Sequence, residues 1–351
     1  MKYDLFVFAG QSNTMGACVL PPKHKPDIKY SFEYKYKPAY LGGDTGKFVP
    51  VGYDCGEFLY KDISAAYKNT DESGQSRLND FFGNAYFAPS LSNLKNAEDK
   101  SVYPFSHYSE SDRNTACCIV PYFCEEWEKL GGRALTAHIA QGGVSAVHFF
   151  SKDMADEYNR FAKLHGYNPI IGDGAAEAVY CGKCRAFFRD AEKLYGGDSI
   201  GEKVLVWNQG ESDSADSCEE YAQKLRILWN KARGLGFCKL FIIRTGYWFT
   251  HDTCRVMHAQ EKFCAENSDA YIITRDISFM PDPHFMENVE NFYTASPAPG
   301  YLFCRDSYYG YENSHINEKG FMIAAKSAAK NAYRVSKEHK EPDLKHDIIK
   351  Y

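Results

Sequence analysis

The chain has 351 residues and a formal net charge of −5, and apolar residues make up 44% of it. This is the composition of a soluble globular protein that is large enough to bury a substantial core. No run rich in Lys and Arg is present, which argues against a nucleic-acid partner, and no run of about 18 apolar residues is present, which argues against a membrane partner.

Five nearly continuous apolar runs alternate with helical runs, a pattern typical of a parallel sheet that is buried on both faces. We therefore predict an α/β fold: a three-layer, doubly wound, flavodoxin-like, five-stranded parallel sheet with helices on both faces. The predicted strands are residues 3–9, 133–140, 203–208, 239–245 and 270–275, and the predicted helices lie near residues 56–68, 115–130, 152–165, 173–195, 216–233, 251–266 and 317–335.

Two long segments, residues 20–114 and 277–311, do not fit a minimal sheet because Gly and Pro interrupt them. Loops of this length in a compact domain are usually functional or disordered. We interpret both as insertions that build walls around the site of a single catalytic domain spanning residues 1–336. Residues 337–351 are predicted to form a charged C-terminal tail.

The first residues and the cysteines bear on the compartment. The opening segment is too short and too acidic for a secretory signal, and it is typical of a buried strand instead. The 12 Cys are scattered rather than spaced as in a disulfide framework, which indicates reduced, buried thiols. We expect a cytoplasmic protein, with a secreted or periplasmic location still open if a leader has been trimmed. The oligomeric state is not predicted.

Two short polar blocks follow the first two predicted strands. The first is Gly-Gln-Ser-Asn at residues 10–13, where a serine at a tight strand-to-helix turn presents its hydroxyl at the top of the sheet. The second, Gln-Gly-Gly-Val-Ser at residues 141–145, contains Gly142 and Gly143, and a glycine pair allows the backbone to approach a ligand and direct an N–H at it. In isolation, both blocks are also typical of ordinary turns.

A third block, Trp-Asn-Gln-Gly-Glu-Ser-Asp at residues 207–213, follows the third predicted strand. The side-chain amide of Gln209 or Asn208 could donate to a developing oxyanion. Glu211 more plausibly braces the loops, and Asp213 or Asp216 could cap the next helix.

The fourth block, Glu-Asn-Ser-His at residues 312–315, precedes the last predicted helix. A carboxylate three residues before a histidine can bind Nδ1 and leave Nε2 to take the serine proton. Together, the four blocks supply a nucleophile, N–H donors, an amide and an acid–histidine pair at one edge of the sheet. These are the parts of an acyl-transfer site.

The four blocks resemble those of SGNH hydrolases, in particular the branch of sialate O-acetylesterases and acetylxylan esterases. That branch carries Gly-Gln-Ser-Asn, a Gly-Gly-Thr-Ser-like block, Trp-x-Gln-Gly-Glu-x-Asp and Asp-x-x-His. The resemblance extends over residues 3–330 without the two insertions. It implies an SGNH hydrolase fold with Ser12 as nucleophile, His315 as base, and an oxyanion hole formed by the N–H groups of Ser12 and Gly143 and the side chain of Gln209.

Two positions differ from the family pattern. Glu312 stands where the family acid is usually Asp, and Asp306 is a weaker alternative for that role. Val144 replaces the usual Thr, so that a hydroxyl contact is lost. The remaining residues that we expect to bind substrate or to line the oxyanion hole are Gln11, Asn13, Gly142, Glu211 and Tyr311.

The resemblance implies a carbohydrate O-acetylesterase that works through an acetyl-enzyme, with acetylated sialic acid as the first substrate to test. Two alternatives stay open: a deacetylase for acetylxylan or another polysaccharide, and a non-catalytic glycan-binding protein on the same fold. We expect no cofactor and no metal, because Cys181 and Cys184 form a C-x-x-C pair without a second ligand pair at a matching spacing.

Overall fold

The computed structural model describes residues 2–15, 24, 26–37, 45–52, 118–140, 143–171, 180–246, 253–279, 316 and 318–344. One sheet runs through these residues in the order β3-β2-β4-β1-β5-β6-β7. Its strands are β1 (Tyr3–Gly10), β2 (Phe32–Lys37), β3 (Thr45–Pro50), β4 (Ala134–Ala140), β5 (Ile200–Asn208), β6 (Lys239–Ile243) and β7 (Ala270–Thr274).

The five predicted strands correspond to β1, β4, β5, β6 and β7. Neighbouring members of this set pair in parallel, so that β1 lies between β4 and β5, and β6 lies between β5 and β7. Numbered along the chain, these five strands have the order 2-1-3-4-5, which is the flavodoxin-like arrangement. Their carboxyl ends therefore meet at one edge of the sheet.

The prediction of five strands, all parallel, is wrong in number and in direction. The described sheet has seven strands, and β3 runs antiparallel to β2. Both additional strands come from residues 20–114, so this segment extends the sheet beside β4. β2 was not predicted because Glu33 and Lys35 interrupt its apolar residues. In the structure, both side chains are buried and form an ion pair of 2.9 Å.

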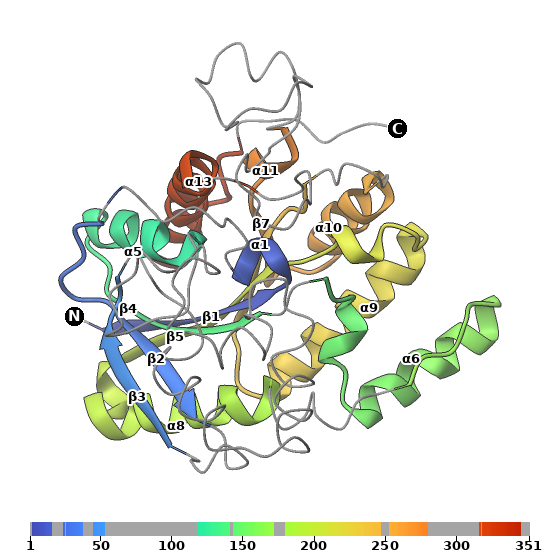
Figure 1. Ribbon diagram of the computed structural model, residues 1–351, viewed down its shortest axis with the longest axis horizontal. Helices are drawn as coiled ribbons and strands as arrows, with labels where there is room; N and C mark the ends of the chain where they lie inside the picture. The colour runs from blue at the N-terminus through green and yellow to red at the C-terminus, as the bar shows by residue number, and fades with distance from the viewer. Residues whose placement is uncertain are drawn as a thin grey trace, which may run out of the picture.

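Helices cover both faces of the sheet (Figure 1). Alternate residues of β1 point to opposite faces, so that Leu5 and Val7 join one core cluster while Phe6 and Phe8 join the other. The first cluster includes residues of α6, α8, α9 and α10, and the second includes residues of α5 and α13. The helices are α1 (Ser12–Met15), α5 (Ile119–Lys129), α6 (Lys152–His165), α8 (Gly182–Tyr195), α9 (Cys218–Gly234), α10 (Cys254–Glu266), α11 (Asp276–Phe279) and α13 (Glu318–Lys337).

Helix ends and helix faces follow local sequence signals. A capping box starts α9: Ser217 Oγ accepts from the N–H of Glu220 at 3.1 Å, and the Glu220 carboxylate accepts from the N–H of Ser217 at 3.0 Å. Small alanine side chains on α13 allow it to pack closely on α5. The helix predicted at residues 56–68 lies outside the described residues.

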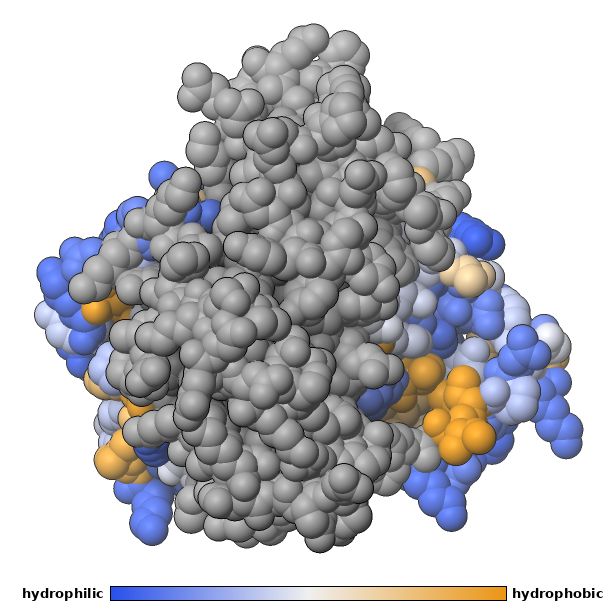
Figure 2. Space-filling model, in the orientation of Figure 1, coloured by the Kyte–Doolittle hydropathy of each residue, from blue (hydrophilic) through white to orange (hydrophobic). Residues whose placement is uncertain are grey.

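The described surface in Figure 2 is mainly hydrophilic, with few hydrophobic patches. None of the described helices is long and apolar enough to span a bilayer. The eight described cysteines are all free, and most of them are buried. Cys181 and Cys184 are among the buried ones, and no three His, Cys, Asp or Glu side chains gather into a metal site within the described part of the chain.

Candidate active site

The first block lies at the carboxyl end of β1, against the end of β5. The N–H of Gln11 donates to the carbonyl of Asn208 at 3.2 Å. A Cβ on Gly10 would lie 2.0 Å from that carbonyl oxygen and 2.4 Å from Thr14 Oγ1, so only glycine fits there. The close approach of these two strand ends fixes where the chain turns into α1, which Figure 1 shows at the centre of the molecule.

Ser12 begins α1 and is 5% exposed. The turn that follows it is held on two sides, because Thr14 Oγ1 donates to the carbonyl of Asn208 at 2.7 Å and His138 Nε2 lies 2.6 Å from the carbonyl of Thr14. Burial and the nearby charges of Lys183 and Lys35 lower the pKa of His138 to about 3, so its ring is neutral and donates through Nε2. Strands β4 and β5 thus fix the backbone that carries Ser12.

Asn13 joins three distant parts of the chain. Its Nδ2 donates to Glu211 Oε1 at 3.0 Å, and its Oδ1 accepts from the N–H of Ile316 at 3.3 Å. All three residues are buried. Burial raises the pKa of Glu211, and the hydrogen bond from Asn13 works against that shift. One amide therefore connects the residue after Ser12 to the third block and to the residue after His315.

Gln11 organises the third block. Its Oε1 accepts from Gln209 Nε2 at 3.1 Å, from the N–H of Ser212 at 3.2 Å and from the N–H of Gly210 at 3.4 Å. These donors lie 198 to 201 residues from Gln11 in the sequence. The first and third blocks thus form one hydrogen-bonded unit, with Gln11 as its acceptor.

Gln209 is fully buried, and its amide is engaged inside the protein. In addition to its hydrogen bond to Gln11, Gln209 Nε2 donates to the carbonyl of Val144 at 3.1 Å and to Asp213 Oδ2 at 2.5 Å. Its Oε1 accepts from the hydroxyl of Tyr221 at 2.9 Å. An amide nitrogen carries two hydrogens, so both are used between the loops in this structure.

The second block reaches the site through its last residues. Gly143 has a φ of 70°, which lies in the left-handed region that favours glycine. Ser145 Oγ donates to Asp213 Oδ1 at 2.5 Å, and the N–H of Ala146 donates to Asp213 Oδ2 at 2.8 Å. Asp213 therefore fastens the loop that contains Gly143 to the third block.

Asp213 is paired with a lysine from α9. Lys224 Nζ lies 2.7 Å from Asp213 Oδ1 and 2.6 Å from Asp216 Oδ2. Burial would lower the pKa of Lys224, but the two carboxylates raise it to about 12. Burial raises the pKa of Asp216 to about 7; Lys224 opposes this shift and the Asp213 charge adds to it.

The structure thus brings together Gln11, Asn13, Gln209 and Glu211 around Ser12, with Val144 linking the loop of Gly143 to them. The other predicted site residues lie outside the described residues: Gly142, Asp306, Tyr311, Glu312 and His315.

Sequence reasoning did not find the role of Asp213 and Lys224. Asp213 was a candidate helix cap, but the cap of α9 is Ser217. A signal for Lys224 existed, since it lies on the buried side of α9 with Tyr221 and Leu225, where a lone lysine needs a carboxylate partner.

No family model matches this chain, and no curated protein matches it. Among solved structures, the chain is similar to NanS (TM-score 0.47, 12% identity, 95% of this chain and 98% of that one) and to a protein from Arabidopsis thaliana (TM-score 0.47, 13% identity, 95% and 98%). It is also similar to a carbohydrate acetylesterase from Xanthomonas citri (TM-score 0.45, 10% identity), with 96% of this chain and 57% of that chain covered. Likeness at this level assigns no activity, so the function proposed below depends on the chain's own residues.

Proposed function

We propose that this protein is a serine esterase that removes O-acetyl groups from carbohydrate, with Ser12 as nucleophile and His315 as base. The observation that carries the proposal is the hydrogen bond from the N–H of Ile316 to Asn13 Oδ1. Ile316 follows His315 in the chain and Asn13 follows Ser12. Ser12 and His315, which would exchange a proton, are therefore each adjacent in the chain to one of two residues that are hydrogen-bonded to each other.

In the proposed reaction, His315 takes the proton of Ser12 Oγ while that oxygen attacks the acetyl carbonyl carbon. The N–H groups of Ser12 and Gly143 donate to the oxyanion of the tetrahedral intermediate. The C–O bond to the sugar then breaks, and the sugar hydroxyl leaves with the proton from His315. Water, deprotonated by His315, hydrolyses the acetyl-enzyme and restores Ser12.

The proposal gives supporting roles to the remaining predicted residues. Glu312 would orient His315 and stabilise the imidazolium, with Asp306 as the alternative acid. Because the Gln209 amide already bridges the first, second and third blocks, we assign it to holding the loop of Gly143 in place. It would have to release one of these partners to serve as a third oxyanion donor.

The substrate class is the one implied by the resemblance of the four blocks to those of sialate O-acetylesterases and acetylxylan esterases, and acetylated sialic acid is the first candidate. Acetylated xylan is the second candidate within the same chemistry. Tyr311 adjoins the fourth block and would offer an aromatic face to a sugar ring. Gly142, beside Gly143, would allow the substrate to approach the backbone closely.

The test is hydrolysis of p-nitrophenyl acetate by the wild type beside Ser12→Ala. Ser199→Ala is the matched control, since Ser199 lies in the turn before β5, at the opposite edge of the sheet. We expect turnover by the wild type and the control, and background rates for Ser12→Ala. Acetylated sialic acids and acetylated xylan oligosaccharides are then compared as substrates by acetate release.

The opposite result is equally clear. If the wild type cleaves none of these esters and a fluorophosphonate does not label Ser12, the esterase proposal is wrong. Retained binding of the same glycans by both the wild type and Ser12→Ala would then identify a binding protein on this fold.

A further inference from the structure

The geometry points to Lys224 and Asp216 as positioning residues that act through Asp213 to hold the loop presenting the Gly143 N–H to the oxyanion. This inference rests on the proposed esterase function. Neither residue was assigned to the site from the sequence. Asp216 lies just before α9, and Lys224 lies within α9. The link runs from α9 through one buried carboxylate to the second block.

The first step concerns the hydrogen bonds that the Asp213 carboxylate accepts. Its Oδ1 accepts from Ser145 Oγ and from Lys224 Nζ, and its Oδ2 accepts from the N–H of Ala146 and from Gln209 Nε2. The side chain of Asp213 is 1% exposed. Four donors on one buried carboxylate fix its position closely; one of them, Ser145, belongs to the second block and another, Ala146, directly follows it.

The second step is the charge balance. A carboxylate this deeply buried needs a counter-ion, and Lys224, whose side chain is 7% exposed, supplies it. Lys224 Nζ also lies 2.6 Å from Asp216 Oδ2, and this second contact restricts where the ammonium can lie. Lys224 can move away from Asp213 only by leaving this buried carboxylate without its cation.

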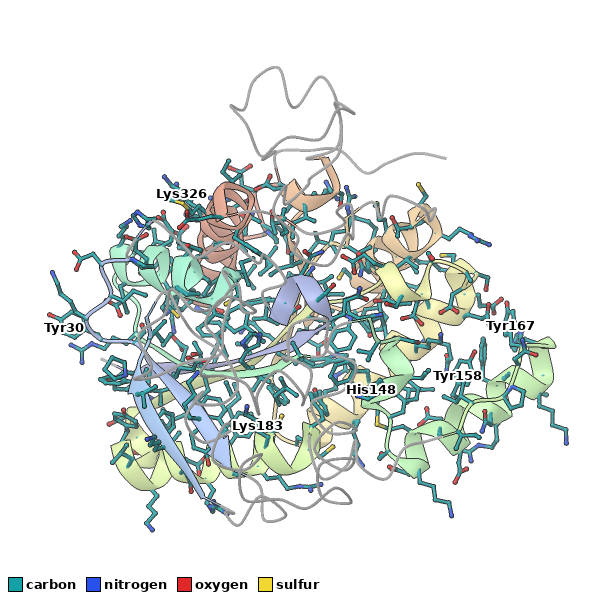
Figure 3. All side chains as sticks on the ribbon, viewed as in Figure 1. Tyr30, His148, Tyr158, Tyr167, Lys183 and Lys326 are labelled. Atoms are coloured by element: carbon teal, nitrogen blue, oxygen red, sulfur yellow. The ribbon has the colours of Figure 1, made fainter. Side chains whose placement is uncertain are left out.

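The third step is the enclosure of this group by neighbouring elements. Tyr158 of α6, labelled in Figure 3, has its ring 5.9 Å from Lys224 Nζ, and its hydroxyl lies 3.4 Å from Glu220. The other charged and titratable groups that interact with the pair are Asp216, Glu220, Tyr158 and Tyr221. With water largely excluded, the ion pair is held in one geometry rather than exchanging among several.

The last step connects this group to the proposed chemistry. Gly143 lies two residues before Ser145, and the intervening Val144 contacts Gln209 through its carbonyl. A loop held at Val144, Ser145 and Ala146 has little freedom to move its Gly143 N–H. Displacement of a group in an active site by about 1 Å can cost roughly 10²-fold in rate.

The experiment compares Lys224→Met with Lys231→Met. Lys231 lies two turns further along α9 and pairs with the exposed Asp153, so it controls for loss of a lysine from this helix. With p-nitrophenyl acetate, we expect Lys224→Met to lower kcat by roughly 10²-fold and to leave KM within about twofold, because the Gly143 N–H acts in the transition state. Lys231→Met should match the wild type in both constants.

A second pair of variants keeps the test decisive if Lys224→Met does not fold. Ser145→Ala removes one donor to Asp213, while Ser145→Thr keeps the hydroxyl, and threonine tolerates the extended backbone at this position. We expect kcat to fall by about tenfold in Ser145→Ala and to recover most of this loss in Ser145→Thr. A merely structural role would lower the melting temperature without this recovery in kcat.

The outcomes separate the two proposals. If the wild type neither hydrolyses the ester nor reacts with a fluorophosphonate at Ser12, the esterase proposal fails and the positioning role fails with it. If the wild type is active and labelled while folded Lys224→Met retains the wild-type kcat, only the positioning role is overturned. Equal loss of kcat in Ser145→Ala and Ser145→Thr would overturn it as well.

Discussion

The two edges of the sheet use charge in opposite ways. At the amino edge, ion pairs such as Lys203–Glu192 and Arg233–Asp269 are substantially exposed. At the carboxyl edge, Asp213–Lys224 is almost fully buried. Exposed pairs contribute little to stability, whereas buried pairs are costly to form and more costly to break. The buried pair therefore fixes the arrangement of loops at the carboxyl edge, whereas the exposed pairs at the amino edge contribute little to stability.

A second buried pair at the carboxyl edge repeats the pattern. Arg244, directly after β6, is fully buried and binds Glu261 of α10 at 2.7 Å. Glu261 also binds Arg275, which follows β7, at 2.7 Å. Buried carboxylates thus join the ends of two strands twice at this edge: Asp213 joins the loops after β4 and β5, and Glu261 joins the residues after β6 and β7.

The largest effect is expected for Asp213→Ala, which leaves Lys224 buried beside Asp216 alone and removes the acceptor of four donors. We expect the free energy of unfolding to fall by about 3–5 kcal/mol, as measured by urea denaturation. The double variant with Lys224→Met should lose less than the sum of the two single variants, since the unpaired charge is then absent. Strict additivity would show that the pair is not coupled.

The next effect is expected for Asn13→Ala, which removes the link from the first block to Glu211 and Ile316. Loss of these hydrogen bonds leaves buried polar groups without partners, and we expect a cost of about 1–3 kcal/mol in the free energy of unfolding. Thermal unfolding and ester hydrolysis measured together check it. A stable variant with unchanged kcat would contradict the role given to this amide.

A pH effect sharpens the comparison further. The pKa of Asp216 is raised to about 7 in the folded protein, so the folded state binds the proton more tightly than the unfolded state does. The stability contributed by the protonated carboxyl is present at low pH and is lost as pH rises toward about 7. The melting temperature of the wild type should therefore fall relative to Asp216→Asn between about pH 4 and pH 7. A constant difference over this range would place the pKa of Asp216 elsewhere.

The smallest effect is expected at the amino edge, for Glu192→Gln. It breaks the pair with Lys203, in which Glu192 is 48% exposed. We expect a change of less than about 1 kcal/mol in the free energy of unfolding and no change in kcat. A larger loss would show that the two edges do not differ as described.

How far the sequence could predict this fold depended on how each strand is buried. β1, β4, β5, β6 and β7 are apolar on both faces, and their continuous apolar runs identified them. β2 is buried as well, but it contains Glu33 and Lys35, which form an ion pair with each other. Because of these two charged residues, its sequence does not form a continuous apolar run. β3 pairs only with β2 and carries no such run. Pairing of buried charges depends on the tertiary structure, and composition does not reveal it.

The candidate site divides in the same way. Ser12, Gln209 and Glu211 come together because parallel strands end at one edge, a rule that applies before any distance is known. Asp213 accepts hydrogen bonds from both Ser145 and Lys224. This arrangement depends on the directions of side chains from different segments, and no spacing in the sequence predicts it. The position of a polar residue after a strand therefore predicted that it lies at the carboxyl edge of the sheet, but it did not predict which residue it would bind.

The contact between Asn13 and Ile316 also has a consequence during synthesis. It joins residues 303 positions apart, and β1 pairs with β4 and β5, which both follow it in the chain. Parallel pairing over such separations is slow, because the chain loses entropy in closing long loops before contacts form. If the proposed site is correct, a nascent chain carries Ser12 long before His315 is synthesised, so hydrolysis would begin only after these two distant segments have come together.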